Sequence, residues 1–321
     1  MNKRYFLISV DTEGDDQWSW TPGKEITTEN ARCLPRFQEL CESFGFKPTY
    51  LTNYEMCRDE RFVKYMKPKA QHGLCEIGMH LHAWNCPPDY QLYSSKEIKA
   101  GQCPYLVEYP TEIMEQKIKT MTDLLANTFD NSVVTHRAGR WAMDDRYYEI
   151  LEKYGYKADC SVTPGVDWRN CEGFVDGSVG SNYINESEKP HFVGGIMEIP
   201  MTVRHLRKLS APKTGSFREF LGRIHGYISG KHEIWLRPNG KNIEDMMYLV
   251  DRCFKSGDEY IMFMIHSSEL MPGGSWRFDT DEKIEKLYGD IEKLFAYVSS
   301  KYTGITIGEY GDFAINKARK H

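Results

Sequence analysis

Short apolar runs alternate with segments of helical period along most of this 321-residue chain. The runs are rich in β-branched and aromatic residues, which predicts strands, and the segments between them predict helices. The strand-like runs lie at about 4–10, 47–53, 75–82, 132–137, 157–163, 195–203, 232–237, 259–266 and 303–307. The clearest helical segments lie at 29–45, 111–129, 144–154, 216–229, 242–256 and 280–300. Strands that alternate with helices are typical of βα units, so we expect a parallel, barrel-like sheet surrounded by helices.

Two connections, 83–110 and 164–194, are longer than ordinary loops in a compact domain. The first contains several prolines, and the second is rich in Gly, Asn and Ser. Because long loops often carry function, we interpret both as rims of a site. The sequence has no internal repeat, low-complexity tract or linker that would divide it, and we expect one domain over residues 1–321.

Composition narrows the class of protein. The net charge of -5 and the pI near 6.1 provide no long-range positive field for a phosphate backbone, so nucleic acid is not an expected partner. No apolar run approaches the roughly 18 residues that span a bilayer. The apolar run at 5–10 is too short for an export signal, and nine irregularly spaced cysteines fit reduced thiols. We therefore expect a cytoplasmic protein without an integral membrane segment.

Pairs of polar side chains with a spacing of two residues occur on two of the predicted strands. Asp11 and Glu13 end the first strand, and His80 and His82 lie on the third. Residues two apart on a strand point to the same side, so each pair faces one cavity. Two histidines near a carboxylate form a metal site that leaves positions open for water and substrate. Taken alone, either pair could instead be a charged turn or a pair of hydrogen-bonded histidines.

Two further strands end in groups that such a site uses. Arg137 ends the fourth strand, and a guanidinium there can hold a carboxylate through two hydrogen bonds. His266 is the first polar residue of an almost wholly apolar strand, and it would emerge at the mouth of the barrel. A surface salt bridge and a buried, hydrogen-bonded histidine are the alternatives. Four strand ends with these groups together favour a metallohydrolase.

In this order, the residues from Val10 to about Leu270 resemble the signature blocks of the polysaccharide deacetylase family, also called NodB homology or carbohydrate esterase family 4. The resemblance implies an irregular (β/α)7-type barrel. It also implies a metal-dependent hydrolase that removes an N-acetyl or other acyl group from an amino sugar. The implied metal is divalent, zinc in the first place, with cobalt, nickel or manganese as alternatives. The Asp-Thr-Glu and His-Leu-His-x-Trp variants are similar to a subgroup associated with lipopolysaccharide and capsule biosynthesis.

The resemblance also implies a role for each residue. Asp11 matches the catalytic base, Arg137 the arginine that pairs with the base, and His266 the general acid. Glu13 and His80 match ligands of the metal. Two other functions stay open: a metal-free sugar-binding protein of the same fold, and an amide hydrolase that acts on another small acylated or formylated substrate.

The second metal histidine is the main departure from the family pattern. In most members it follows the first histidine by four residues, but Trp84 occupies that position here, and His82 is the candidate ligand. Trp84 and Trp141 could stack on the rings of a carbohydrate substrate, as could Trp18 and Trp20. The segment 273–277 is either a plain surface turn or a loop that closes over substrate, in which its arginine could meet a phosphate or an acidic sugar.

Overall fold

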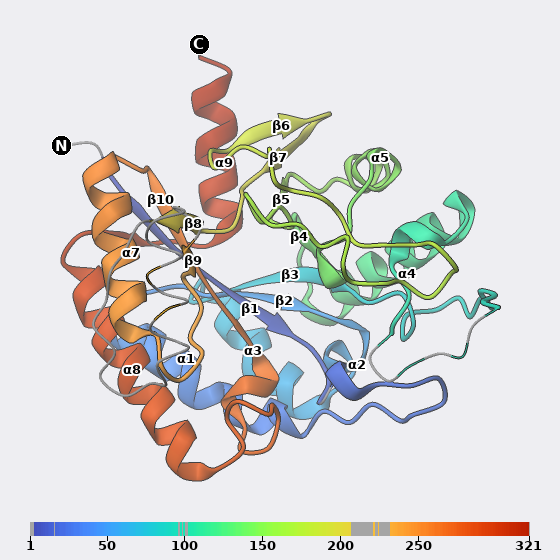
Figure 1. Cartoon of the computed structure of the whole chain (residues 1–321), viewed down its shortest axis with the longest axis horizontal. Helices are drawn as coiled ribbons and strands as arrows, with labels where there is room; N and C mark the ends of the chain where they lie inside the picture. The colour runs from blue at the N-terminus through green and yellow to red at the C-terminus, as the bar shows by residue number, and fades with distance from the viewer. Residues whose placement is uncertain are drawn as a thin grey trace.

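A parallel sheet that curls into a half-barrel forms the centre of the computed structural model of the chain (Figure 1). The structure describes residues 3–15, 17–95, 97, 99, 102–206, 221, 224 and 232–320. Its strands are β1 (Tyr5–Thr12), β2 (Thr49–Thr52), β3 (Glu76–Leu81), β4 (Thr135–Ala138), β5 (Ala158–Asp159), β6 (His191–Val193), β7 (Ile196–Glu198), β8 (Val203–Leu206), β9 (His232–Trp235), β10 (Tyr260–His266) and β11 (Thr303–Gly304). Its helices are α1 (Leu34–Ser43), α2 (Tyr54–Cys57), α3 (Glu60–Gln71), α4 (Thr111–Phe129), α5 (Asp145–Lys153), α7 (Ile243–Ser256), α8 (Asp281–Ser299) and α9 (Ile307–Ala318).

The main sheet has the strand order β10-β1-β2-β3-β4-β5-β7-β6, and β11 also pairs with β1. All of its neighbours run parallel except the β6–β7 pair, while β8 and β9 form a separate antiparallel pair. Strand β1 is buried along its whole length, as expected for a central parallel strand covered on both faces. The predicted barrel-like parallel sheet surrounded by helices is therefore confirmed.

Isolated hydrogen bonds, in place of a continuous ladder, join the two sides of the curl. The amide of Met264 on β10 donates to the carbonyl of Leu236 at 3.1 Å, and the amide of Leu236 donates to the carbonyl of Thr202 at 3.2 Å. The amide of Met201 in turn donates to the carbonyl of Val162, just beyond β5, at 2.9 Å. The sheet consequently bends far enough to surround one cavity at the carboxyl ends of its strands.

The helices cover the outside of the curl, with α7 and α8 packed against each other (Figure 1). On α8 the buried side chains recur every three or four residues, which makes one face of the helix apolar. Phe295 of that face contacts the rings of Phe6 on β1 and Phe263 on β10, with ring centroids 5.6 Å apart in each pair. Burial of one such side chain stabilises the fold by about 1.5–3 kcal/mol. Within the described ranges, every helix is too short or too polar to cross a bilayer.

Several predicted boundaries are wrong, each for a local reason. The expected helix at 29–45 starts as a 3-10 turn, and α1 begins only at Leu34 because Pro35 suits the first turn of a helix. The expected strand at 195–203 divides into β7 and the first residue of β8. The helix expected at 216–229 lies almost entirely outside the described residues.

Three of the helices that the structure describes are absent from the sequence-based prediction: the single-turn α2 and the longer α3 and α9. Helix α3 carries Pro68 in its interior, which weakens its helical signal, yet Asp59 caps its start by accepting hydrogen bonds from two backbone amides. Helix α9 starts with a capping box between Thr306 and Glu309. Both caps are visible in the sequence and could have located these helices.

Candidate active site

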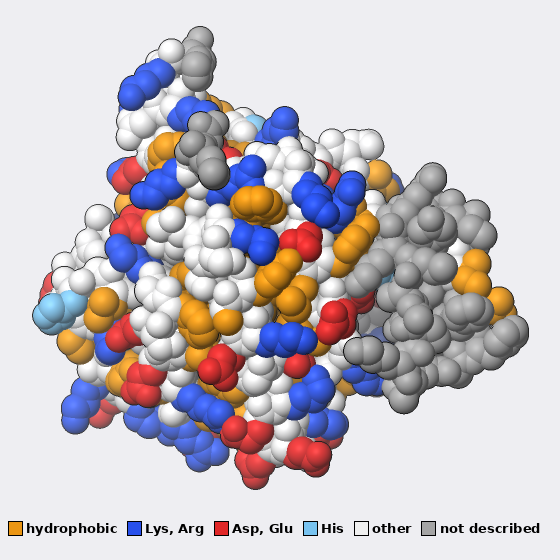
Figure 2. All heavy atoms as spheres, turned by 90° about the vertical axis from the view of Figure 1, so that its left-hand side faces the viewer, with side chains coloured by type: hydrophobic (Ala, Val, Ile, Leu, Met, Phe, Trp, Pro, Cys, Tyr) orange, Lys and Arg blue, Asp and Glu red, His pale blue; other side chains and the backbone are white. Residues whose placement is uncertain are grey.

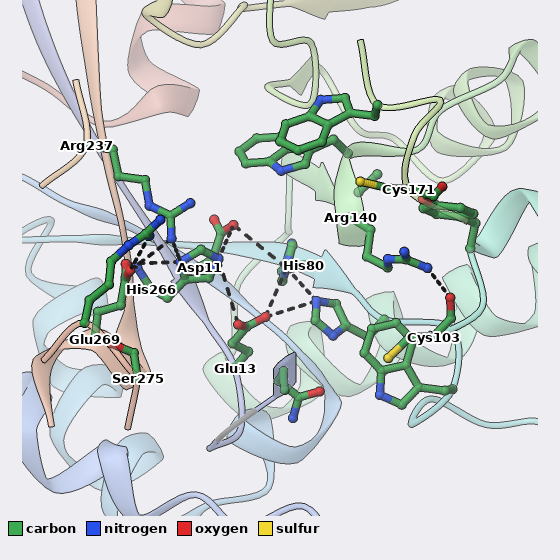
Figure 3. Close-up of a pocket in the computed structure, with 18 of the residues that line it drawn as sticks. Asp11, Glu13, His80, Cys103, Arg140, Cys171, Arg237, His266, Glu269 and Ser275 are labelled. Atoms are coloured by element: carbon green, nitrogen blue, oxygen red, sulfur yellow. Dashed lines mark hydrogen bonds and ion pairs between the residues drawn. The ribbon is translucent and has the colours of Figure 1, made fainter. Parts of the chain in front are cut away.

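The predicted site residues meet at the carboxyl ends of four strands (Figure 3). Asp11 and His266 are partners in the register of β1 and β10. His80 and Arg137 are partners in the register of β3 and β4. Because parallel strands place their carboxyl ends at one edge of the sheet, residues far apart in the sequence line a single cavity of about 430 Å³.

Three potential metal ligands lie together at the bottom of this cavity. The Nε2 atom of His82 is 3.0 Å from Oε2 of Glu13, and the Nε2 atom of His80 is 3.5 Å from the same oxygen. The two Nε2 atoms are 2.8 Å apart. All three side chains are buried, and one ligand atom from each lies within 4.8 Å of the others.

The protonation of the two imidazoles bears on whether this cluster fits a cation. Nδ1 of His80 lies 3.0 Å from the carbonyl oxygen of Arg137, which can only accept, so Nδ1 carries the proton and Nε2 offers a lone pair. Nδ1 of His82 is buried and has no partner among the described residues. Two imidazole nitrogens and a carboxylate converge, and this donor set suits zinc and similar divalent ions.

The charges of two of the three ligand groups, Glu13 and His82, fit the same interpretation, whereas burial of His80 is outweighed by Asp11 and Glu13, which raise its pKa. Burial alone would raise the pKa of Glu13, but its interactions with the imidazoles of His82, His266 and His80, hydrogen bonds among them, lower it below its ordinary value, so Glu13 is a carboxylate. Burial lowers the pKa of His82, which favours the neutral imidazole that a metal binds.

Asp11 lies beside this cluster and is paired with Arg137. One Nη1–H of the guanidinium donates to Oδ1 of Asp11, while Nη2 donates to Ser9 at 3.0 Å and Nε to the carbonyl of Cys160 at 3.1 Å. Arg137 is fully buried and therefore fixed in place. Burial would raise the pKa of Asp11, but the charge of Arg137 together with the imidazoles of His80 and His266 outweighs it and keeps the pKa below the ordinary value. The structure thus supplies an ionised, oriented carboxylate.

His266 lies across the cavity from the histidines of β3. Its Nε2 atom is 3.8 Å from Oδ2 of Asp11 and 3.9 Å from Oε1 of Glu13. Its Nδ1 atom lies 3.2 Å from Oε2 of Glu269, and the same oxygen accepts the backbone amide of His266 at 3.0 Å. Arg237 donates to the other oxygen of Glu269 at 3.0 Å. Sequence reasoning missed Glu269 and Arg237, although Glu269 follows His266 by only three residues.

Aromatic side chains form two walls of the cavity. Trp84 packs against the imidazole of His82 with ring centroids 4.3 Å apart, and against Trp20 at 5.6 Å. On the other wall, Trp141 is nearly parallel to Trp168, at 9° and 6.4 Å between centroids. Both predicted tryptophans, Trp84 and Trp141, line the cavity, and so do residues of both long loops.

A strained turn after β4 places one of these walls. Arg140 and Trp141 have φ angles of 56° and 62°, a left-handed conformation that non-glycine residues adopt at a cost of order 1–3 kcal/mol each. The hydroxyl of Tyr183 donates to the carbonyl of Trp141 and stabilises the turn. Gly139 precedes it, and a Cβ there would lie 2.6 Å from Cδ2 of His82. The turn therefore packs directly on a candidate metal ligand.

Glu55, which sequence reasoning also missed, connects the loops below the site. Its Oε1 atom accepts from the amide of Gly14 at 3.1 Å and from the side chain of Asn53 at 2.5 Å. Its Oε2 atom accepts from the side chain of Asn85 at 2.5 Å. Burial raises the pKa of Glu55 to about 7. The loops that follow β1, β2 and β3 are thus held together by one carboxyl group.

Comparison with known proteins identifies the fold. No family model and no curated protein matches the sequence. Among solved structures, a "putative polysaccharide deacetylase from Mycobacterium smegmatis" superimposes with a TM-score of 0.55 at 11% identity, over 99% of this chain and 92% of that chain. A GH57-type branching enzyme from Pyrococcus horikoshii gives 0.54 at 12% identity, over 96% and 70% of the two chains. A 4-alpha-glucanotransferase from Thermococcus litoralis gives 0.50 at 14% identity, over 97% and 40%.

The chain therefore has the fold of the polysaccharide deacetylases, as the sequence resemblance implies. At these identities the comparison shows the fold alone. Membership of the subgroup associated with lipopolysaccharide and capsule biosynthesis stays a prediction.

Proposed function

We propose that this protein is a metal-dependent hydrolase that removes an N-acetyl or other N-acyl group from an amino sugar of a polysaccharide or its precursor. The observation that carries the proposal is the meeting of two carboxylates and three histidines in one cavity, where carboxylate oxygens lie 3.0 to 3.9 Å from imidazole nitrogens: Asp11, Glu13, His80, His82 and His266. We extend the proposal to a cytoplasmic precursor in lipopolysaccharide or capsule biosynthesis.

Glu13, His80 and His82 would hold the divalent ion, zinc in the first place. When bound, such an ion lowers the pKa of a coordinated water and polarises a carbonyl group. Asp11 would accept the proton from the attacking water, since the charge of Arg137 keeps this carboxylate ionised. The fully buried Arg137 also fixes the direction in which Asp11 points.

His266 would donate a proton to the departing sugar amine. Its Nε2 atom faces the cavity, whereas its Nδ1 atom faces Glu269, which holds the ring in position. The base and the acid thus lie on two different strands beside the ligand cluster. Trp84 and Trp141 would stack on the sugar or on its acyl group, because both form apolar walls of the same cavity.

The test measures bound metal and acetate release together. Wild-type protein is analysed for metal content, stripped with a chelator, reloaded with zinc, cobalt, nickel or manganese, and assayed on N-acetylated and N-formylated sugars. Asp11→Asn and His266→Ala should retain the metal and lose turnover, whereas His80→Ala should lose both. Glu285→Gln, an exposed charge removal distant from the ligand cluster in sequence, serves as the matched control.

Each alternative has its own result. A protein that binds no metal after reloading and hydrolyses none of the sugars would be a sugar-binding protein of the same fold. Turnover of formylated substrates alone would favour a different amide hydrolase. Full activity in the Asp11→Asn variant would remove that carboxylate from the role of base.

A further inference from the structure

The cavity is positively charged although the protein as a whole has a net charge of -5. Among the described residues, three carboxylates line the cavity, and so do three arginines, Arg140, Arg237 and Arg277. Arg137 adds a fourth positive charge from beneath, through its pair with Asp11. Glu55 below the site, whose pKa burial raises to about 7, offsets this fourth charge only in part, so a partial positive charge remains before any divalent ion adds two more. Charges gathered in a cavity with low-dielectric walls act strongly on a substrate.

The outer surface differs from the cavity. On the face seen in Figure 2, Lys and Arg side chains are interspersed with Asp and Glu side chains. Exposed ion pairs of this kind include Arg36 of α1 with Glu285 of α8, at 2.6 Å. Positive side chains on this surface therefore have negative neighbours, whereas those around the cavity have fewer. This difference indicates that the positive charge of the cavity has a function in binding.

The shortage of negative charge is clearest around Glu269. This buried carboxylate is shared by two arginines, because Arg237 lies 3.0 Å from its Oε1 atom and Arg277 lies 3.7 Å from the same atom. Glu269 also binds His266. The Nε atom of Arg237 is buried without a partner in the described part of the chain. Burial and the like charge of Arg237 lower the pKa of Arg277 below its ordinary value, although Glu269 opposes them.

These arginines lie where two cavities meet. Arg237, Arg277 and Trp168 line both the catalytic cavity and an adjoining one of about 340 Å³. Figure 3 shows Arg237 on the His266 side of the site and Arg140 on the opposite side. The side chain of Arg277 lies over the ring of Trp276, which is 73% exposed at the rim. An apolar ring beside a guanidinium suits a sugar that carries a negative charge.

We propose that the substrate carries an oxyanion group, a phosphate or a carboxylate, that binds the guanidinium groups of Arg277 and Arg237 where the two cavities meet. This inference rests on the proposed function, since it names the class of amino sugar that the same site accepts. Guanidinium groups bind both oxyanions through charge-assisted hydrogen bonds. Glu233 and Asp245 line the adjoining cavity and would repel an anion, which confines the anion to the junction.

The test compares three probes that differ in charge: N-acetylglucosamine, N-acetylglucosamine 1-phosphate and N-acetylmuramic acid, which carries a carboxylate. Binding is measured by calorimetry on zinc-loaded protein in an Asp11→Asn background, so that the probes stay intact. Arg277→Gln should weaken binding of at least one anionic probe by about 10- to 100-fold, the cost of a lost charge-assisted contact, and leave the neutral probe unchanged. Arg277→Lys should restore part of the loss.

Arg169→Gln is the matched control, because Arg169 is exposed, pairs with Asp167 at 2.7 Å and lines neither cavity. The phosphate and carboxylate probes decide between the two anions. Equal affinity of the unsubstituted background for all three probes, or an equal loss for the neutral probe in Arg277→Gln, would overturn the proposal. Selective anion binding without acetate release from any probe by wild-type protein would refute the hydrolase and leave the anion site standing. Acetate release without charge selectivity would do the reverse.

Discussion

Replacement of Glu269 by glutamine tests how His266 is held. Glu269 is 1% exposed and receives the backbone amide and the Nδ1 side of His266 on one oxygen and Arg237 on the other. Glutamine keeps the size but removes the charge. The Nη2 atom of Arg237 lies only 2.9 Å from Nδ1 of His266, so in the variant a guanidinium would face a positively charged imidazole without the carboxylate that now opposes it.

The magnitude follows from the separation of the charges. At 3.2 Å and an effective dielectric of about 20, a carboxylate stabilises an imidazolium by about 5 kcal/mol. Because Glu269 also binds Arg237, we expect the Glu269→Gln variant to lose only roughly half of this energy, about 3 kcal/mol, when His266 carries charge. That loss corresponds to a decrease in kcat of about 100-fold, since about 1.4 kcal/mol changes a rate tenfold. The free energy of unfolding should fall by about 1–3 kcal/mol.

Acetate release gives kcat and KM, and urea denaturation gives the free energy of unfolding. Glu269→Asp retains the charge and should recover part of kcat, whereas the exposed Glu285→Gln should change the unfolding free energy by less than about 0.5 kcal/mol. A Glu269→Gln protein that folds and keeps the wild-type kcat would refute the positioning role of this carboxylate.

Two further substitutions test the fold around the site. Gly139→Ala places a Cβ 2.6 Å from His82, so we expect the variant to lose bound metal and about 1–3 kcal/mol of unfolding free energy. The control is Gly289→Ala in α8, where a Cβ meets nothing and the unfolding free energy should rise by about 0.5–1 kcal/mol. Equal metal contents of the two variants in elemental analysis would contradict this reasoning. Burial would raise the pKa of Asp59, but hydrogen bonds from Arg61, Thr28 and the backbone amide of Phe62 together lower it to about 2 from 3.8. The carboxylate therefore stabilises the fold above pH 3.8, and Asp59→Ala should lower the free energy of unfolding by about 1–2 kcal/mol at pH 7. In urea denaturation, this difference between wild type and variant should shrink as the pH falls from 3.8 through 2. A difference that stays constant with pH would show that the charge of Asp59 has no part in it.

Sequence patterns were sufficient to predict the parallel sheet and the strand ends that meet at the cavity. Period-two spacing placed Asp11 with Glu13 and His80 with His82, because side chains alternate along any strand whatever the tertiary structure. Each pair lies at the end of one strand, with Glu13 one residue beyond β1 and His82 one residue beyond β3, so its relative placement is local. Whether pairs from different strands meet depends on strand order, which only the fold-level pattern could suggest.

The missed residues depend on tertiary contacts. Arg237 reaches His266 from the connection after β9, and Glu55 contacts the first loop across more than 40 positions of sequence. Neither has a periodic pattern. The left-handed backbone at Arg140 and Trp141 was equally hidden, because neither residue type favours it and the surrounding contacts impose it. That residues 1–321 form one domain stays a prediction.

Strand β2 supplies none of the candidate ligands, yet it sets their geometry. It pairs with β1 on one side and β3 on the other, so Glu13, directly after β1, and His80, on β3, belong to chain segments separated by about 10 Å, twice the usual interstrand spacing. Leu51, at the middle of β2, faces Gly78 in the register of β3, and a Cβ on that glycine would come within 2.8 Å of the leucine side chain. Substitutions in β2 could therefore adapt the site to a larger or smaller ion and leave every candidate ligand in place.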